Sequence, residues 1–219
     1  MAWLNLYTLC ILALVLAAQF FYRFSSGRLA AFFIKFKFHT FLRWIWILSG
    51  VLIFSLLTYW SYLQYELWSG EGGFGKFLLP PYQSIYYFFS YVGVRFFGPW
   101  ILAFFAAILV SRLAKFLNRR FEERFFEPEE IELIALGTFL AGYPGFFFYL
   151  ALILTVGVLF SAFYLLLSKG RLPLYYFWIP LAIFAIIMKI WFLGYLGNGF
   201  VSFWGSFSLG DFYKLIFGF

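Results

Sequence analysis

The chain has 219 residues, of which 65% are hydrophobic and 11% are charged, and its 16 Lys and Arg residues outnumber its 9 Asp and Glu residues. A soluble domain of this size needs many more polar side chains to cover its surface, so the composition excludes a soluble globular protein and predicts an all-α integral membrane protein with one polytopic domain. His39, Cys10 and Asp211 are each the only residue of their type, which excludes an intrachain disulfide and a metal centre of Cys and His ligands, and we expect no enzymatic activity.

The first predicted membrane span covers residues 3–22, a run without any charged residue. Its length matches the roughly 20 residues that a helix needs to cross a bilayer. No positively charged segment precedes the run and no convincing cleavage site follows it, so we expect a retained span rather than a signal peptide. The basic residues directly after it place the N-terminus on the non-cytoplasmic side.

A basic stretch without acidic residues follows the first span. It mixes Phe side chains with cations, as segments that lie in the plane of the membrane interface do. We therefore expect membrane lipids as partners, with anionic headgroups contacted by Arg23, Arg28, Lys35, Lys37 and Arg43. No nucleic acid is expected here, because the flanking spans hold these rings at the lipid surface. His39 is the candidate ligand for a haem or pigment metal, and a surface histidine is the alternative reading.

Two further spans are predicted at residues 41–65 and 98–116. Trp and Tyr side chains stand at both ends of the first of these two, as expected for the two membrane–water interfaces. The aromatic segment over residues 84–97 is predicted to form a separate interfacial helix on the outer side. Pro99 stands at the start of the second of these spans, where its missing N–H costs little.

The stretch from residue 118 to residue 132 carries much of the charge of the chain. Its predicted cytoplasmic charge cluster includes Arg119, Arg120, Glu123, Arg124, Glu127, Glu129 and Glu130. The sequence Glu127-Pro128-Glu129-Glu130 is typical of a helix start, because acidic side chains are favoured in the first turn. We interpret the cluster as a solvated loop whose charges neutralise one another, and cation binding or acid–base chemistry by its carboxylates is the alternative.

A helical hairpin is predicted next. Residues 131–142 are too few to cross a bilayer, and Gly142-Tyr143-Pro144-Gly145 favours a turn before a full-length span at residues 146–167. A single kinked helix is the alternative, but it would place Lys169 and Arg171 outside. The positive-inside rule therefore favours the hairpin.

The last predicted span covers residues 173–193 and holds Lys189 near its outer end, where the long side chain reaches the interface. Residues 194–219 are predicted to form an outer tail. The resulting topology has about six membrane segments and both termini on the non-cytoplasmic side. It places twelve of the 16 Lys and Arg residues at the cytoplasmic side, as the positive-inside rule requires.

From Glu127 to about Trp191 the chain has an acidic motif opening a short helix, a Gly-Pro turn, a long helix, a basic loop and a Pro-containing span, in that order. This order resembles the C-terminal half of the type IV prepilin peptidases, a family of intramembrane aspartyl proteases. Where the family motif ends in aspartate, this chain has Glu129 or Glu130. The family mechanism implied by the resemblance needs two facing carboxylates that share a proton, but Asp211 lies in the predicted outer tail. The resemblance therefore implies a catalytically degenerate relative.

These observations predict a non-enzymatic structural or accessory subunit of a larger membrane protein complex. Aromatic residues make up 28% of the chain, and we expect them to pack against other subunits and lipid. A transporter, or a protein that binds an apolar small molecule or pigment, is one alternative. A catalytically degenerate protein like the prepilin peptidases is another. The sequence requires no cofactor.

Overall fold

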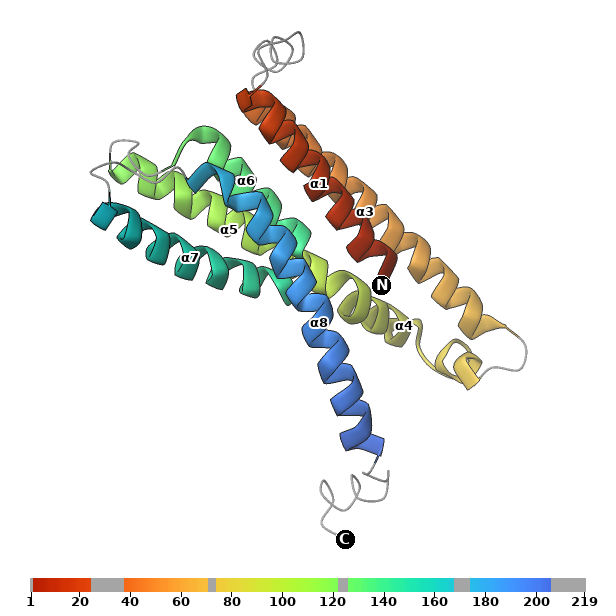
Figure 1. The fold of residues 1–219 in the computed structure, drawn as a ribbon. Helices are drawn as coiled ribbons and strands as arrows, with labels where there is room; N and C mark the ends of the chain where they lie inside the picture. Colours follow the sequence, from red (N-terminus) through yellow and green to blue (C-terminus); the bar gives the residue numbers. More distant parts are fainter. Residues whose placement is uncertain (1, 25–37, 71–73, 122–125, 168–173, 206–219) are drawn as a thin grey trace.

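The computed structural model describes residues 2–24, 38–70, 74–121, 126–167 and 174–205. Within them all regular secondary structure is helical, as the composition predicted. The elements in chain order are α1 (Ala2–Phe24), α3 (Phe38–Ser69), η1 (Phe74–Leu78), α4 (Ile85–Val92), η2 (Gly93–Phe97), α5 (Gly98–Arg120), α6 (Pro128–Ala141), α7 (Gly145–Leu167), η3 (Leu174–Tyr176) and α8 (Trp178–Gly205) (Figure 1).

Helix α6 is the centre of the fold. The helices α1, α3, α5, α7 and α8 all contact it, and Figure 1 shows α1 and α3 as an antiparallel pair along one side of the molecule. From Glu130 to Ala141, every residue of α6 except Glu132 is buried. A helix that is apolar on all sides is stable only where other helices cover it on all sides, which is the position that α6 occupies.

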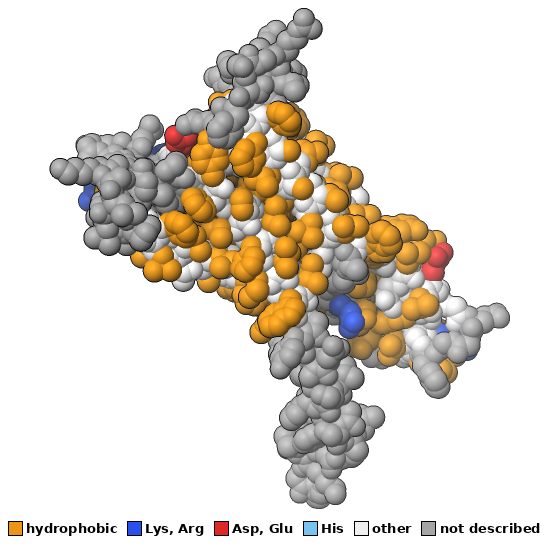
Figure 2. Space-filling view, viewed as in Figure 1, with side chains coloured by type: hydrophobic (Ala, Val, Ile, Leu, Met, Phe, Trp, Pro, Cys, Tyr) orange, Lys and Arg blue, Asp and Glu red, His pale blue; other side chains and the backbone are white. Residues whose placement is uncertain are grey.

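The outer helices turn large apolar side chains away from this centre. Leu14, Trp44 and Leu109 are 57%, 58% and 69% exposed. Hydrophobic side chains cover the middle of the face seen in Figure 2, and the charged side chains in view lie nearer its two ends. An apolar surface of this extent fits a protein surrounded by lipid.

Three helical stretches in the described residues are long and apolar enough to cross a membrane, namely Trp3–Tyr22, Phe38–Ser69 and Ile85–Arg120. The apolar helices Gly145–Phe160 and Trp178–Phe192 are shorter. The predicted number of about six membrane segments is therefore not supported. Helix α6 alone, with 14 residues, is about 21 Å long and falls short of a bilayer core.

The separate interfacial helix predicted over residues 84–97 is wrong, because α4, η2 and α5 run on as one continuous helical stretch. The segment η2 is a π-helical turn in which the Gly98 N–H donates to the Gly93 carbonyl. Pro99 explains this turn. It has no N–H, and in a regular α-helix its ring would clash with the carbonyl four residues earlier, whereas a wider turn lets the helix continue.

A short helix and a long helix flank the turn at Gly142, as the hairpin prediction requires, and α6 and α7 contact each other. Gly142 has a φ of 62°, which glycine adopts more readily than other residues. The Phe146 N–H donates to the Gly142 carbonyl at 2.7 Å and closes the turn. Helix α8 continues to Gly205 instead of ending near residue 193, and residues 206–219 of the predicted outer tail lie outside the described residues.

The ends of α1, α5 and α7 and the starts of α3 and α6 lie at one end of the molecule (Figure 1). We call it the basic end, because it carries Arg43, Lys115, Arg119 and Arg120. The chain connections after α1, α5 and α7 also begin there, and their sequences contain Arg28, Lys35, Lys37, Arg124, Lys169 and Arg171. The side chains of residues 23–37 and of residues 168–173 are not among those that the structure describes.

Candidate functional site

Two buried ionisable side chains mark the two ends of α6. Among the described residues, Glu130 in its first turn is 7% exposed, and Lys189 of α8, beside its last turn, is 4% exposed. Burial of a charged group is costly unless hydrogen bonds or opposite charges compensate it. The partners of these two groups therefore decide what the centre of the fold can do.

Glu130 is held by two hydrogen bonds. The Glu127 N–H donates to its Oε2 at 2.9 Å, and the indole Nε1 of Trp178 donates to its Oε1 at 3.1 Å. The first bond is half of a capping box that starts α6, and the second joins α6 to α8. Burial raises the pKa of the Glu130 carboxyl above its ordinary value, although both hydrogen bonds oppose the shift.

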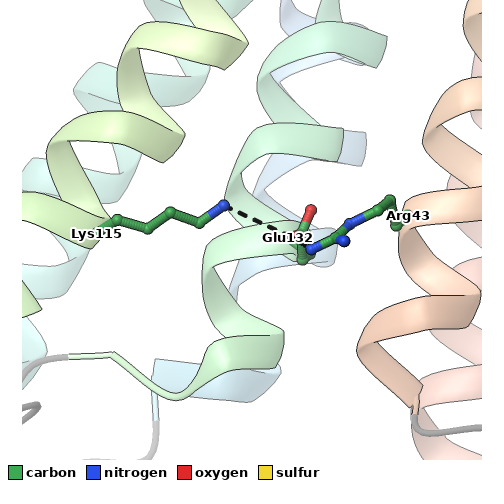
Figure 3. A network of polar contacts seen from close by, with 3 residues as sticks. All are labelled: Arg43, Lys115 and Glu132. Atoms are coloured by element: carbon green, nitrogen blue, oxygen red, sulfur yellow. Dashed lines mark hydrogen bonds and ion pairs between the residues drawn. The ribbon is translucent and has the colours of Figure 1, made fainter.

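Glu132 lies between two cations from different helices (Figure 3). Its Oε1 is 3.1 Å from Nη2 of Arg43 in α3 and 3.8 Å from Nζ of Lys115 in α5. The Glu132 side chain is 13% exposed, whereas the two cations are 56% and 47% exposed. The carboxylate is thus the shielded member of the group, and it ties α6 to both neighbours at the basic end.

Two more polar contacts fix the entry to α6. The Tyr22 hydroxyl of α1 donates to Oε1 of Glu129 at 3.2 Å. Asn118 of α5 forms two hydrogen bonds with the backbone of Phe126, donating from Nδ2 at 2.6 Å and accepting at Oδ1 at 2.9 Å. The acidic side chains at the start of α6 therefore bond to α1, α3, α5 and α8, and each of these bonds lies within the chain.

At the other end of α6, Lys189 Nζ donates to the Ala141 carbonyl at 2.8 Å. This carbonyl is one of the last in α6 and has no partner within the helix, and the partial negative charge of a helix C-terminus favours a cation there. The fit is close, because a Cβ on Gly145 would lie 3.0 Å from Lys189 Cδ. Lys189 therefore caps α6 instead of reaching the outer interface as the sequence predicted.

In the described residues, buried polar atoms without a hydrogen-bond partner include Gln19 Oε1, Trp46 Nε1 and Tyr149 Oη. Tyr149 of α7 is fully buried against α6, and a Cβ on Gly137 would lie only 2.6 Å from its hydroxyl oxygen. Gly137 thus lets the two helices approach closely. No group of three or more His, Cys, Asp or Glu residues that would hold a metal occurs in the described residues.

The structure brings only part of the predicted sites together. His39 lies half-buried in the first turn of α3, and Arg43 is exposed and paired with Glu132. Arg119 and Arg120 are exposed in the last turn of α5. The side chains of Arg23, Arg28, Lys35, Lys37, Glu123 and Arg124, and Asp211, lie outside the described residues.

The interpretation of residues 118–132 as a solvated loop is wrong where the structure describes them, because residues 118–120 belong to α5, Glu130 is buried and Glu132 is bonded to neighbouring helices. Sequence reasoning missed the roles of Asn118, Trp178 and Lys115. Asn118 was the one amide in a run of charged residues, which is a signal for a backbone contact. Trp178 lies 48 positions from Glu130 along the chain, and Lys115 lies 17 positions from Glu132, so no local sequence pattern marks either pair.

Comparisons with protein-family models, with curated proteins and with solved structures give no match to this chain.

Proposed function

We propose that the chain is a non-enzymatic structural or accessory subunit of a larger membrane protein complex. In this proposal it is a multi-pass protein with six membrane segments, in which α6 and α7 form a hairpin, both termini lie on the non-cytoplasmic side and the basic end faces the cytoplasm. Other membrane subunits and lipids are its partners.

The observation that carries the proposal is how the polar groups of α6 are used. Glu129, Glu130 and Glu132 each bond to another helix of the same chain, so these side chains hold the neighbouring helices against α6. Among the described residues the carboxylates outside this group are Glu127, the exposed N-cap residue of α6, and Glu66 in α3; Glu66 is the one on another helix. It follows Arg43 by 23 positions, roughly 35 Å along α3, which is too far to share a proton with Glu130.

The outer surface supports a packing role. Leu14 on α1 and Leu52 on α3 are 57% and 50% exposed, and both lie on helices long enough to cross a membrane. Between apolar helices in lipid, association depends on close packing of side chains. Exposed helix faces of this kind fit either lipid or other subunits.

Site-specific photo-crosslinking tests the proposal. A photo-reactive residue at Leu14 or Leu52 is expected to give a defined protein adduct in native membranes, whereas the same residue at Leu12, which is fully buried, gives none. Light scattering of the purified protein in mild detergent should then show the partner in a fixed ratio. A monomeric protein with lipid adducts only would contradict the proposal.

The proposed orientation has its own test. After Cys10→Ser, single cysteines are introduced as Arg120→Cys at the basic end and as Lys76→Cys in η1 at the opposite end. A membrane-impermeant maleimide added to intact cells should label Lys76→Cys and leave Arg120→Cys unlabelled until the membrane is opened. The reverse pattern would invert the topology.

Transport is the second candidate function, and Lys189 is the observation that favours it. Ionisable residues inside a membrane bundle often mark ion pathways, and Lys189 lies where the hairpin interrupts a helix. If the chain carries a proton or ion, Lys189→Met should abolish the flux in proteoliposomes while leaving the fold intact. A structural role predicts no flux in either protein.

The resemblance to prepilin peptidases supports a third reading, that of a catalytically degenerate relative kept for assembly. Glu130 is the candidate for the motif carboxylate, and both of its oxygens accept hydrogen bonds within the chain. We therefore expect no cleavage of a prepilin-like peptide by the purified protein. Cleavage that Glu130→Gln abolishes would overturn this reading.

A further inference from the structure

The outward face of α5 combines an apolar groove with a cation. The groove has a volume of about 440 Å³ and is lined by Phe105, Ala106, Ile108, Leu109 and Arg112. Phe105 and Leu109 are 63% and 69% exposed. These residues lie on a helical stretch that is long and apolar enough to cross a membrane, so the exposed groove is suited to face lipid.

Arg112 lies inside this apolar face and not at the end of it. Residues 105, 109, 112 and 116 recur at helical spacing, so Phe105, Leu109, Arg112 and Phe116 share one face of α5. Arg112 precedes the last helical residue, Arg120, by 8 positions, or roughly 12 Å along the axis. The apolar side chain of Phe116, which is 63% exposed, stands between Arg112 and the helix end.

The described residues offer Arg112 no ion pair. Glu132, the carboxylate that pairs with Lys115 of the same helix, is also paired with Arg43. An exposed guanidinium surrounded by apolar side chains at the edge of the membrane needs an anion or water. A phosphate group matches its fork of N–H donors, because guanidinium and phosphate form paired hydrogen bonds.

We propose that this face of α5 is a binding site for one anionic phospholipid, with an acyl chain in the groove and the headgroup phosphate on Arg112. The lipid's net negative charge complements Arg112, whereas a zwitterionic headgroup brings its own cation to the same place. The site needs only that α5 faces lipid, so it stands apart from the partner subunits and the topology proposed above.

Native mass spectrometry of the purified, delipidated protein tests the site. Phosphatidylglycerol and phosphatidylcholine with identical acyl chains are added separately, and the first is expected to bind preferentially. One cation near the lipid surface accounts for about a fivefold change in affinity, so Arg112→Gln should bind phosphatidylglycerol about fivefold more weakly. Arg112→Lys should bind between these two, because it keeps the charge but loses the paired hydrogen bonds of the guanidinium.

Arg120→Gln is the matched control, since Arg120 is an exposed arginine at the end of the same helix. It should bind phosphatidylglycerol like the unmodified protein. Glycerol phosphate, which has a headgroup but no acyl chain, should not displace the lipid. Equal binding of phosphatidylcholine, unchanged binding by Arg112→Gln, an equal loss in Arg120→Gln or displacement by glycerol phosphate would each overturn the proposal.

Discussion

The contact between Gly137 of α6 and Tyr149 of α7 predicts that Gly137→Ala destabilises the protein. The added Cβ would lie 2.6 Å from Tyr149 Oη and 2.7 Å from its Cζ, whereas carbon atoms in contact are usually about 3.5–4.0 Å apart. The ring has no free direction in which to move, because Tyr149 is 0% exposed. The two helices must therefore separate or the ring must leave its position.

The magnitude follows from two opposing effects. Overpacking of a buried site typically costs about 1–3 kcal/mol, and the overlap of nearly 1 Å places this site in the upper part of that range. Alanine also lowers the backbone entropy cost of the helix, which regains about 0.5–1 kcal/mol. We expect a net loss of about 1–2 kcal/mol in the free energy of unfolding, which lowers Tm by about 2–8 °C for a chain of this length.

Tryptophan fluorescence during thermal unfolding in one fixed detergent measures the change. Gly157→Ala in α7 is the control, because no atom lies within 4 Å of a Cβ there, and it should keep or raise Tm. Adding Tyr149→Phe to Gly137→Ala should restore part of the loss, since the hydroxyl is removed while Cζ remains at 2.7 Å. If Gly137→Ala matches the control, the close packing of α6 on α7 is refuted.

Three further changes act at the ends of α6. Glu132→Gln should lower the free energy of unfolding by about 1 kcal/mol, because it removes the ion pairs with Arg43 and Lys115. This loss should be smaller at high salt, since both partner cations are about half exposed. The control Glu66→Gln, far from α6, should change the free energy of unfolding by less than about 0.5 kcal/mol. Lys189→Met should change the free energy of unfolding by less than about 1 kcal/mol, because the lost hydrogen bond and the removed burial cost of the ammonium offset each other. Lys189→Glu should destabilise the protein strongly, because it places an acidic group against the Ala141 carbonyl. Equal effects of the two substitutions would contradict the capping role. Because burial raises the pKa of Glu130 in the folded state, the folded protein holds this proton more tightly than the unfolded chain does. The contribution of Glu130 to stability should be greatest below the ordinary Glu pKa and be lost as pH rises through the raised value. Glu130→Gln should remove this part of the slope in Tm against pH.

Local patterns predicted the helical elements well where the signal lay in neighbouring residues. The sequence Glu127-Pro128-Glu129-Glu130 marked the start of α6, and Gly142 with Pro144 marked the turn into α7. Both signals are local, because helix caps and turns depend on a few consecutive residues. The boundaries of long apolar helices were less accurate, as apolar residues continue past the span and give no stop signal.

The stretch around Pro99 shows where a local rule failed. Proline usually marks a helix start, so residues 84–97 and the span after them were predicted as two helices. In the structure the π-helical turn η2 absorbs the missing hydrogen bond and the helix continues from Ile85 to Arg120. The outcome depended on how a whole turn adjusts its hydrogen bonds.

The sequence by itself indicated a helical protein suited to a membrane and marked the start of α6 and the turn into α7. The reason is that 65% hydrophobic residues leave too few polar side chains to face water, and that helix starts and turns depend on adjacent residues. Only the tertiary structure decided that α6 is enclosed by five helices, that Glu132 joins Arg43 to Lys115, and that Lys189 caps the end of α6. These partners lie tens of residues apart along the chain. A buried charge takes whichever group the packing of helices brings within hydrogen-bond distance, and helix packing depends on the shape of the whole bundle.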